Sequence, residues 1–574
     1  MPQPTDDAAR GGGRSEAPVS ERRTDPVERG AQGAGADLAD LVAALPGARV
    51  DGDATGVRVL GATLDSRAVR AGDLYAALPG ARVHGADFAA AAVAAGAACV
   101  LTDPAGAGRA AAAGAPVLVT PDPRAVLGDL AARVHRTGVH APPGRAPVLL
   151  GVTGTNGKTT TAYLLEGALS ALGRTTGLVG TVETRVAGEV VASTRTTPEA
   201  PDLHALLGRM ERAGVEVAAL EVSSHALVLH RVDGVVLDVA AFTNLSQDHL
   251  DFHDGMEDYF AAKASLFTPE RSRRGVVVVD DAWGERLARE ARVPVTTVTT
   301  RPGARPGEDA DWVALDPQVE STGTGFVLAG PEGARLPLRA PLPGAFNVAN
   351  TALAAVVLLE AAPLLPGATT PDALAAGLAR AGGVPGRLQV VAPSRPAGGS
   401  GAPRVPRVLV DYAHTPDAVA AALEAVRPSA RGRRVAVVGA GGDRDRGKRG
   451  PMGAAAARHA DVVVVTDDNP RSEDPAAVRA AVLAGATAPQ PDGSAPGGAP
   501  GDARPAPQVL EVADRAAAIR AALDAAGEDG TVLVAGKGHE RGQEVAGVVH
   551  PFDDRDEVRA ALDALLGPDE SESA

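Results

Sequence analysis

The chain has 574 residues, too many for one ordinary hydrophobic core, and this length predicts two to four domains. Its formal charge of −15, with no strongly basic stretch, argues against a protein that binds nucleic acid. The single cysteine, Cys99, excludes a disulfide framework and a cysteine-based zinc site. The N-terminus lacks the apolar core of a signal peptide, and we find no uninterrupted apolar segment of spanning length. We therefore expect a cytoplasmic protein without membrane insertion.

The amino-acid composition of the chain changes near residue 35. Residues 1–35 are rich in Gly, Arg, Asp, Glu and Pro and have few large apolar side chains, so we expect a disordered tail. Residues 36–145 alternate short apolar runs with alanine-rich stretches, which predicts an α/β domain. The predicted strands are 57–60, 73–78, 98–101 and 116–119.

A glycine-rich loop, Gly151-Val-Thr-Gly-Thr-Asn-Gly-Lys-Thr-Thr160, opens the second part of the chain. It follows a predicted strand at 146–150 and precedes a predicted helix at 161–170. Backbone N–H groups of such a loop and the helix N-terminus bind phosphate, Lys158 can reach the outer phosphates, and the Thr159 hydroxyl can bind Mg²⁺. Val152 stands where the strict nucleotide-binding pattern has its first glycine. The loop predicts a bound nucleotide phosphate, without specifying the reaction.

Strands and helices alternate through the rest of the chain. Continuous apolar runs at 217–222, 239–243 and 276–279 predict central parallel strands in a domain spanning 146–384. A third domain, 385–574, has the alternation of a doubly wound sheet, and its Pro/Gly/Ala-rich stretch 488–507 is typical of a flexible insertion. The predicted strands of this domain are 407–410, 435–438, 462–465 and 531–535.

Polar clusters follow two of the predicted central strands, at the edge where open α/β sheets bind their ligands. Glu221-Val-Ser-Ser-His225 comes after one strand, and Asn244-Leu-Ser-Gln-Asp-His249 after the next. His249 and His253 have the spacing of a zinc-binding pair, but no third ligand is obvious. Magnesium prefers hard oxygen donors such as Thr159 and Glu221, so we favour magnesium over zinc.

These motifs together resemble the Mur ligase family. The resemblance also includes Asn347-Val-Ala-Asn350 and Asp411-Tyr-Ala-His-Thr-Pro416, and it extends from about residue 55 to the end, except for 488–507. It implies three α/β domains: an N-terminal UDP-binding domain, a central P-loop ATPase-like domain with a parallel sheet, and a C-terminal Rossmann-like, doubly wound domain.

The resemblance implies an ATP- and Mg²⁺-dependent amide ligase. ATP would phosphorylate a substrate carboxylate, and an amine would attack the resulting acyl phosphate. The resemblance assigns catalysis to Lys158, Glu221, His249 and Lys263. It further implies that Lys263 is carbamylated to N6-carboxylysine, because an ammonium would repel the metal. Metal ligation falls to Thr159, Glu221, His249 and Lys263, and ATP binding to Gly154, Thr155, Asn156, Gly157, Lys158, Thr159, Thr160, Asn347, Asn350, Arg387, Asp411 and His414.

Within the family, Asp468-Asn-Pro-Arg471 and Gly536-Lys-Gly-His-Glu540 are similar to members that add meso-diaminopimelate to UDP-N-acetylmuramoyl-L-alanyl-D-glutamate. A bidentate guanidinium at Arg471 suits the second carboxylate of diaminopimelate, whereas lysine would leave that charge unpaired. The implied diaminopimelate site is Arg444, Asp468, Asn469, Pro470, Arg471, Gly536 and Glu540.

The resemblance also implies where the UDP-linked dipeptide binds. Separately, we expect a monomer, although the sequence does not specify the oligomeric state. Some relatives have a glutamine that hydrogen-bonds to the substrate where this chain has Leu229. The resemblance therefore does not extend to this hydrogen bond. The implied contacts are Ser66, Arg67, His84, Thr196, Thr197, Ser223 and Arg231.

Three other functions share part of this pattern. A folylpolyglutamate synthase would have the phosphate loop and the modified lysine, but not the boxes around Arg67 and Arg471. A P-loop switch or motor would hydrolyse ATP without an amino-acid acceptor. A non-catalytic binding module would not be expected to keep the set Lys158, Thr159, Glu221, His249 and Lys263.

Overall fold

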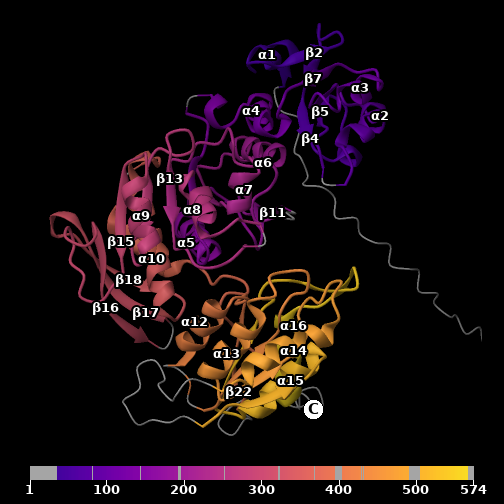
Figure 1. Ribbon diagram of the computed structural model, residues 1–574. Coiled ribbons are helices and arrows are strands. Elements are labelled where there is room, and N and C mark those ends of the chain that lie inside the picture. Colours follow the sequence, from indigo (N-terminus) through magenta and orange to yellow (C-terminus); the bar gives the residue numbers. More distant parts are fainter. Residues whose placement is uncertain are drawn as a thin grey trace, which may run out of the picture.

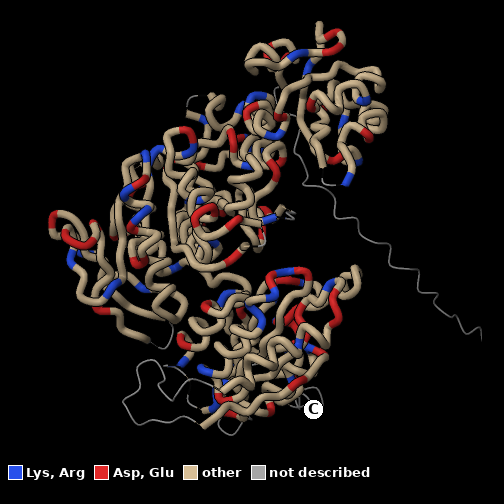
Figure 2. The backbone as a smooth tube through the Cα atoms, in the orientation of Figure 1, with Lys and Arg blue, Asp and Glu red and all other residues tan. Residues whose placement is uncertain are grey.

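The structure is a computed structural model. It describes residues 35–80, 82–142, 144–191, 195–250, 252–320, 323–367, 369–394, 404–427, 430, 432–489 and 505–566. The expected tail, except for Gly35, and most of the expected 488–507 insertion lie outside the described residues. In the described residues, three sheets of five or more strands follow one another along the chain, and the first and last lie at opposite ends of the central one (Figure 1). Basic and acidic residues are interspersed along all three parts (Figure 2).

The first sheet has five strands in the order β2-β7-β6-β5-β4 and is mainly parallel. Separate apolar clusters cover its two faces. Of the predicted strand at 57–60, only Arg58–Val59 form a strand, β3, which pairs with β1 outside this sheet, and the strand that pairs with β5 is β4, which begins after the predicted range. The strands are β1 (Ala36–Asp37), β2 (Arg49–Asp51), β3 (Arg58–Val59), β4 (Gly61–Thr63), β5 (Asp73–Ala76), β6 (Cys99–Thr102) and β7 (Val117–Val119), and the helices are α1 (Leu38–Ala43), α2 (Ala89–Ala94), α3 (Ala107–Ala111) and α4 (Pro123–His135).

The central sheet has eleven strands, with the phosphate loop leaving β8 in its parallel middle. The continuous Val/Ala/Leu runs form these inner strands, as predicted for strands buried on both faces. The antiparallel strands β16–β18 were not predicted, because they alternate buried and exposed residues instead of forming continuous apolar runs. The strands are β8 (Val148–Thr153), β9 (Thr176–Val179), β10 (Thr184–Val186), β11 (Glu189–Val191), β12 (Val217–Glu221), β13 (Val239–Phe242), β14 (Gly275–Val278), β15 (Val295–Thr299), β16 (Trp312–Glu320), β17 (Gly323–Ala329) and β18 (Arg335–Ala340).

Helices cover both faces of the central sheet. One apolar cluster joins α5, α10 and α11 to it, and a second joins α6, α7, α8 and α9 to the opposite face. The segment Ala345–Leu364 has the length and mean hydropathy of a membrane span, although Asn347, Asn350 and Glu360 interrupt its apolar run, so the expectation that no uninterrupted apolar segment reaches spanning length is not contradicted here. Because 67% of its most apolar window is buried in the protein, it packs as a core helix. The helices are α5 (Lys158–Ala171), α6 (Ala200–Arg212), α7 (Ser224–Val228), α8 (Met256–Ala264), α9 (Ala282–Glu290), α10 (Ala345–Ala361) and α11 (Pro371–Arg380).

The last sheet is doubly wound, as predicted, with the order β19-β20-β24-β21-β22-β23. Helices α12–α14 pack on one face and α15 and α16 on the other. Its strands are β19 (Gln389–Val391), β20 (Arg407–Asp411), β21 (Arg434–Val438), β22 (Val462–Val465), β23 (Gln508–Glu511) and β24 (Thr531–Ala535), followed by the hairpin β25 (Gly542–Val545) and β26 (Val548–Pro551). The helices are α12 (Pro416–Val426), α13 (Arg449–His459), α14 (Pro475–Ala486), α15 (Arg515–Ala526) and α16 (Asp554–Leu565).

A buried histidine lies where the first part meets the central part. His204 of α6 has no exposed surface, and its Nε2 donates to the Asp233 carbonyl at 2.9 Å. Its Nδ1 therefore accepts from the Thr137 hydroxyl, 2.7 Å away at the end of α4. Burial lowers the pKa of His204 to about 4. The ring is consequently neutral in the folded protein at neutral pH.

Acid should destabilise this junction. Unfolded histidine takes up a proton near its ordinary pKa of 6.5, but folded His204 does so only near 4, so stability is complete above 6.5 and is lost as the pH falls towards 4. Between pH 8 and pH 5 the loss amounts to about 2 kcal/mol. Chemical unfolding at both pH values should show this loss in the wild type and a smaller one in His204→Gln, which cannot titrate. Equal losses in the two proteins would contradict the assignment.

Candidate active site

Two glycines shape the loop between β8 and α5. Gly154 has φ 143°, and a Cβ there would lie 1.9 Å from the Thr243 hydroxyl oxygen. Gly157 has φ 87°, and its Cβ would lie 2.3 Å from Oδ1 of Asn350. A side chain at either place would therefore combine backbone strain with a collision. Asn244 fixes the loop further, since its side-chain oxygen accepts from the backbone N–H of Asn156 at 3.0 Å.

Lys158, the first residue of α5, directs its ammonium to the loop itself. Nζ donates to the carbonyls of Gly154 and Thr155 at 3.0 and 2.8 Å. Burial lowers the pKa of Lys158, and the charges of Glu221 and Asp248 oppose that shift. The loop thus has a cation at its centre, next to the helix N-terminus, which is the combination that binds phosphate.

Thr159 and Glu221 form a fully buried pair of oxygen donors. The Thr159 hydroxyl donates to Oε2 of Glu221 at 2.9 Å, and Glu221 has no exposed surface. Thr181 holds the carboxylate from the other side, through its backbone N–H at 2.8 Å and its hydroxyl at 3.0 Å. A hydroxyl and a carboxylate beside the phosphate loop fit the donor chemistry of Mg²⁺. Among the described residues, no three His, Cys, Asp or Glu side chains form a metal-binding group.

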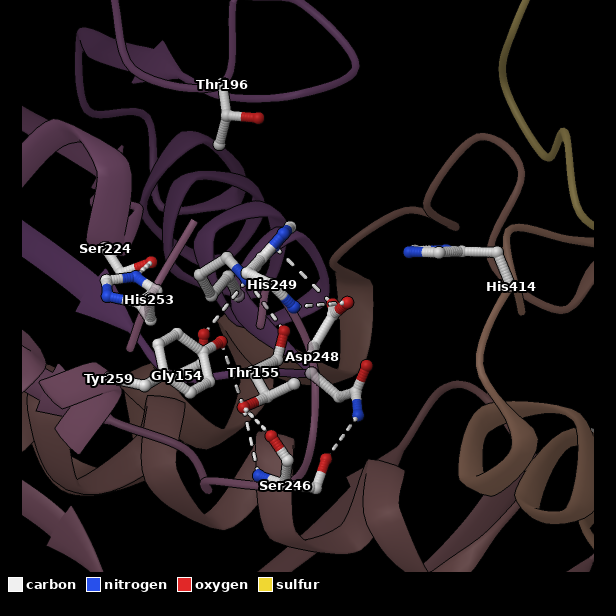
Figure 3. Close-up of polar contacts among 12 residues, drawn as sticks. Gly154, Thr155, Thr196, Ser224, Ser246, Asp248, His249, His253, Tyr259 and His414 are labelled. Carbon is white, nitrogen blue, oxygen red and sulfur yellow. Dashed lines mark hydrogen bonds and ion pairs between the residues drawn. The ribbon is translucent and has the colours of Figure 1, made fainter. Parts of the chain in front are cut away.

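Lys263 lies beneath the loop and does not line the cavity described below. It is 1% exposed, and its Nζ donates to the Gly154 carbonyl at 2.8 Å. The same Nζ lies 4.5 Å from the ring centre of Tyr259, whose hydroxyl is 3.2 Å from the Thr155 hydroxyl (Figure 3). Burial first, and then the charge of Lys158, holds the pKa of Lys263 well below its ordinary value. This amine is therefore neutral and nucleophilic far more often than an exposed lysine.

His249 lies next to Asp248, and its ring centre is 6.2 Å from that of Tyr259 (Figure 3). It has the positive φ of 56°, and its Nε2 is 3.5 Å from Oδ2 of Asp248. Burial lowers the pKa of His249 despite the neighbouring carboxylate. The second histidine of the pair considered for zinc, His253, is occupied elsewhere, by Ser224 at 3.0 Å and Asp258 at 2.9 Å. The zinc alternative therefore finds no support in the geometry.

A cavity of about 370 Å³ joins the phosphate loop to the last part of the chain. Arg387 spans it: the guanidinium lies 4.4 Å from the ring centre of Tyr412 and donates to the Thr159 hydroxyl at 3.3 Å. Asp411 accepts from two backbone N–H groups, and its removal from water raises its pKa. The lining includes these members of the expected ATP set: Thr155, Asn156, Gly157, Lys158, Thr159, Thr160, Asn347, Asn350, Arg387, Asp411 and His414.

The asparagines expected to bind ATP, Asn347 and Asn350, lie near the start of α10 and are buried. Asn347 donates to the Pro343 carbonyl at 2.7 Å, and Asn350 donates to Oδ1 of Asn347 at 3.3 Å. His414 faces the cavity from the last part of the chain, and its Nδ1 donates to the Tyr412 carbonyl at 2.8 Å (Figure 3). Residues far apart in the sequence thus surround one cavity.

The structure separates the residues expected to bind the UDP-linked dipeptide. Thr196 and Ser223 line the cavity, and Thr196 lies 3.0 Å from the Thr181 hydroxyl. Buried Thr197 donates to the Glu221 carbonyl at 2.8 Å, and Arg231 pairs with Glu199 at 2.9 Å. The remaining three, Ser66, Arg67 and His84, belong to the first part and do not line that cavity.

The residues expected to bind diaminopimelate form a second cluster, apart from the cavity. Asn469 donates to Oε2 of Glu540 at 2.8 Å, and fully buried Lys537 donates to Oδ1 of Asn469 at 2.9 Å. Arg471 donates to the Gly442 carbonyl at 2.7 Å.

Close approaches bring the remaining members into this cluster. A Cβ at Gly441 would meet Arg471 Nη1 at 2.9 Å and Arg444 Cγ at 3.7 Å, so both arginines lie against that glycine. A Cβ at Gly536 would lie 2.3 Å from Oδ2 of buried Asp468. The carbonyl of Pro470 would lie 1.9 Å from a Cβ at Gly442. Cations and anions therefore face each other here, which suits a ligand carrying both charges.

Sequence reasoning missed several residues that organise these sites. Asp248 and Lys537 lie inside motifs already noted, so their position was a usable signal. Thr181 and Tyr259 have no such signal, because their contacts to Glu221 and Thr155 join separate elements. Tyr412 lies inside the box that contains Asp411, and its ring supports Arg387.

Comparisons with known proteins agree with this arrangement. The Mur ligase catalytic domain matches residues 58–135, the Mur ligase middle domain 152–358, and the Mur ligase glutamate ligase domain 386–538. The UDP-N-acetylmuramoyl-L-alanyl-D-glutamate--2,6-diaminopimelate ligase of Streptomyces coelicolor is 53% identical, over 92% of this chain and 97% of that protein. The UDP-N-acetylmuramyl-tripeptide synthetase of Leifsonia xyli is 49% identical, over 95% and 98%.

A solved structure agrees as well. It is a UDP-N-acetylmuramoyl-L-alanyl-D-glutamate--2,6-diaminopimelate ligase, with a TM-score of 0.60, 31% identity, and coverage of 90% of this chain and 97% of that one. The family domains match in chain order, and the relatives cover nearly the whole sequence. This chain therefore belongs to the Mur ligase family.

Proposed function

We propose that this protein joins meso-diaminopimelate to UDP-N-acetylmuramoyl-L-alanyl-D-glutamate at the expense of ATP, in peptidoglycan precursor synthesis. The observation that carries this proposal is the pair of sites described above. One places a phosphate loop against Arg387, and the other places Arg471 near Asn469 and Glu540. The relatives named for this reaction support the choice of substrates.

In the first half-reaction, the free D-glutamate carboxylate attacks the γ-phosphorus of ATP, an acyl phosphate forms and ADP leaves. Lys158 and the loop N–H groups hold the phosphates, and Arg387 neutralises charge from the opposite wall of the cavity. Thr159 and Glu221 would hold Mg²⁺, which supplies further neutralisation of the phosphate oxygens. His249 and Lys263, if carbamylated, would hold a second Mg²⁺.

In the second half-reaction, the amine attacks the acyl carbon, the amide bond forms and phosphate leaves. Arg471 binds the distal carboxylate of diaminopimelate and Glu540 the distal ammonium. Arg444, Asp468, Asn469, Pro470 and Gly536 complete that pocket. The dipeptide is held by Thr196, Thr197, Ser223 and Arg231, and the UDP moiety by Ser66, Arg67 and His84.

The three parts would act as three domains, with boundaries near 36–145, 146–384 and 385–574. The acceptor pocket and the phosphate loop belong to different domains, so the amine must be brought to the acyl phosphate across that boundary. We further propose that the protein works as a monomer in the cytoplasm.

Phosphate release, measured with the UDP-linked dipeptide and each candidate amino acid in turn, tests this function. We expect turnover that requires both ATP and meso-diaminopimelate. Turnover with L-lysine but not with meso-diaminopimelate would overturn the choice of acceptor. ATP hydrolysis without any acceptor would instead favour a switch or motor.

A further inference from the structure

The acceptor pocket contains a carboxylate that neither the motifs nor the proposed mechanism uses. Glu544, on β25, lies with its Oε2 3.4 Å from Nε of Arg471. The two side chains are 39% and 23% exposed, so the pair is only partly open to water. The arginine that should receive the substrate's distal carboxylate therefore already faces an anion.

Backbone contacts keep Glu544 beside Arg471 whatever rotamer its side chain adopts. The backbone N–H of Arg471 donates to the Glu544 carbonyl at 3.0 Å, and the N–H of Ala546 donates to the Arg471 carbonyl at 2.7 Å. The N–H of Glu544 donates to Oδ1 of Asn469 at 3.0 Å. The Asp-Asn-Pro-Arg segment and β25 thus form one hydrogen-bonded unit, and the backbones of Glu544 and Arg471 stay next to each other.

Glu540, the other carboxylate of the pocket, has different partners. Its Oε2 accepts from Asn469 at 2.8 Å and lies 3.3 Å from Nζ of buried Lys537. These contacts orient Glu540 and leave its second oxygen available for an ammonium. The two carboxylates therefore have different partners: Glu540 is held by Lys537 and Asn469, whereas Glu544 faces Arg471.

This pairing changes how the pocket discriminates between acceptors. An unpaired guanidinium would penalise lysine, which has no distal carboxylate to offer. With Glu544 in place, lysine leaves an existing ion pair intact, whereas diaminopimelate must exchange one carboxylate for another. We propose that Glu544 is a specificity-determining residue that competes with the acceptor's distal carboxylate for Arg471. This inference rests on the proposed function, because it takes diaminopimelate as the acceptor.

The variant Glu544→Gln tests the competition, since it keeps the size and backbone of the residue and removes the charge. We expect the KM for meso-diaminopimelate to fall by about two- to fivefold, the range of a partly exposed ion pair. The KM values for ATP and the UDP-linked dipeptide should not change. The ratio of kcat/KM for meso-diaminopimelate to that for L-lysine should rise.

A matched control is Glu285→Gln on α9, far from the pocket. Glu285 is 41% exposed and pairs with Arg301 at 2.7 Å. The Glu285→Gln variant therefore loses a similar surface ion pair and should leave every KM unchanged. Thermal unfolding of both variants checks that neither loses its fold.

Two results would overturn the inference. A higher KM for meso-diaminopimelate in Glu544→Gln would mean that Glu544 binds the substrate's ammonium, and an unchanged KM would mean that it does not compete for Arg471. Either KM result can be obtained only if the wild-type enzyme turns over meso-diaminopimelate. A wild type without such turnover would overturn the proposed function instead, so the two failures are distinguishable.

Discussion

Replacing Lys263 with alanine should lower the ligation rate by about a thousandfold or more, as expected when a group that organises charge around a phosphoryl transfer is removed. The environment of this lysine supports the proposed carbamylation. Its amine is buried, close to the Lys158 charge, and has a pKa far below the ordinary value, so its lone pair can react with CO₂. The resulting carbamate would place an anion beneath the loop, where metal and phosphate must be held together. Phosphate release with saturating substrates measures the effect.

Small carboxylates such as acetate or formate should partly restore Lys263→Ala, because they can occupy the space of the lost carbamate. Glu257→Ala is the matched control, since Glu257 lies on the same helix, α8, is 73% exposed and pairs with Arg286. This control should keep full activity and show no response to acetate. Full activity of Lys263→Ala without added carboxylate would remove Lys263 from the mechanism.

Replacing Arg471 with methionine should raise the KM for meso-diaminopimelate by about one to two orders of magnitude, because the substrate's distal carboxylate then loses its charged partner in a partly enclosed site. Arg471 has φ 51°, so methionine inherits the same backbone strain, and the comparison isolates the guanidinium. Arg471→Lys should recover only part of the loss, because an ammonium keeps the charge without the bidentate geometry. Steady-state kinetics with varied acceptor measure both variants.

Arg301→Met is the control for this pair of variants, because Arg301 is 40% exposed and forms an ion pair with Glu285 away from both sites. The KM values for ATP and the UDP-linked dipeptide should stay constant in all three proteins. An unchanged acceptor KM in Arg471→Met would show that the distal carboxylate binds elsewhere.

The inner strands were predictable because their burial leaves continuous apolar runs, as in β8, β12 and β13. The outer strands were not, since β17 and the edge strand β18 mix buried and exposed residues, and β19 and β23 are short edge strands. Edge strands are identified by their partners, and pairing across distant segments has no local signature.

The residues of the candidate site divide in the same way, into those that a local motif predicts and those that depend on contacts between distant segments. Motifs place Lys158, Glu221 and Asp411 at or just beyond the ends of predicted strands. Open α/β sheets bind their ligands there, so the positions of these residues could be predicted from the sequence. The hydrogen bond between Arg387 and Thr159 joins residues 228 positions apart and depends on how two sheets meet. The role of Glu544 could not be predicted from the sequence either, because it depends on the register between β25 and the segment around Arg471.

The burial of the lysines has a consequence for chemical footprinting. The chain has only four lysines, at 158, 263, 448 and 537, and arginine carries the rest of its basic charge. None of the four is classed among the exposed residues, and Lys263 and Lys537 are almost fully enclosed. An acylating reagent selective for ε-amines would therefore find Lys158 and Lys263 at the phosphate loop, Lys537 in the acceptor pocket, and Lys448 directly before α13. Its labelling pattern, with and without ATP or acceptor, would report ligand occupancy site by site.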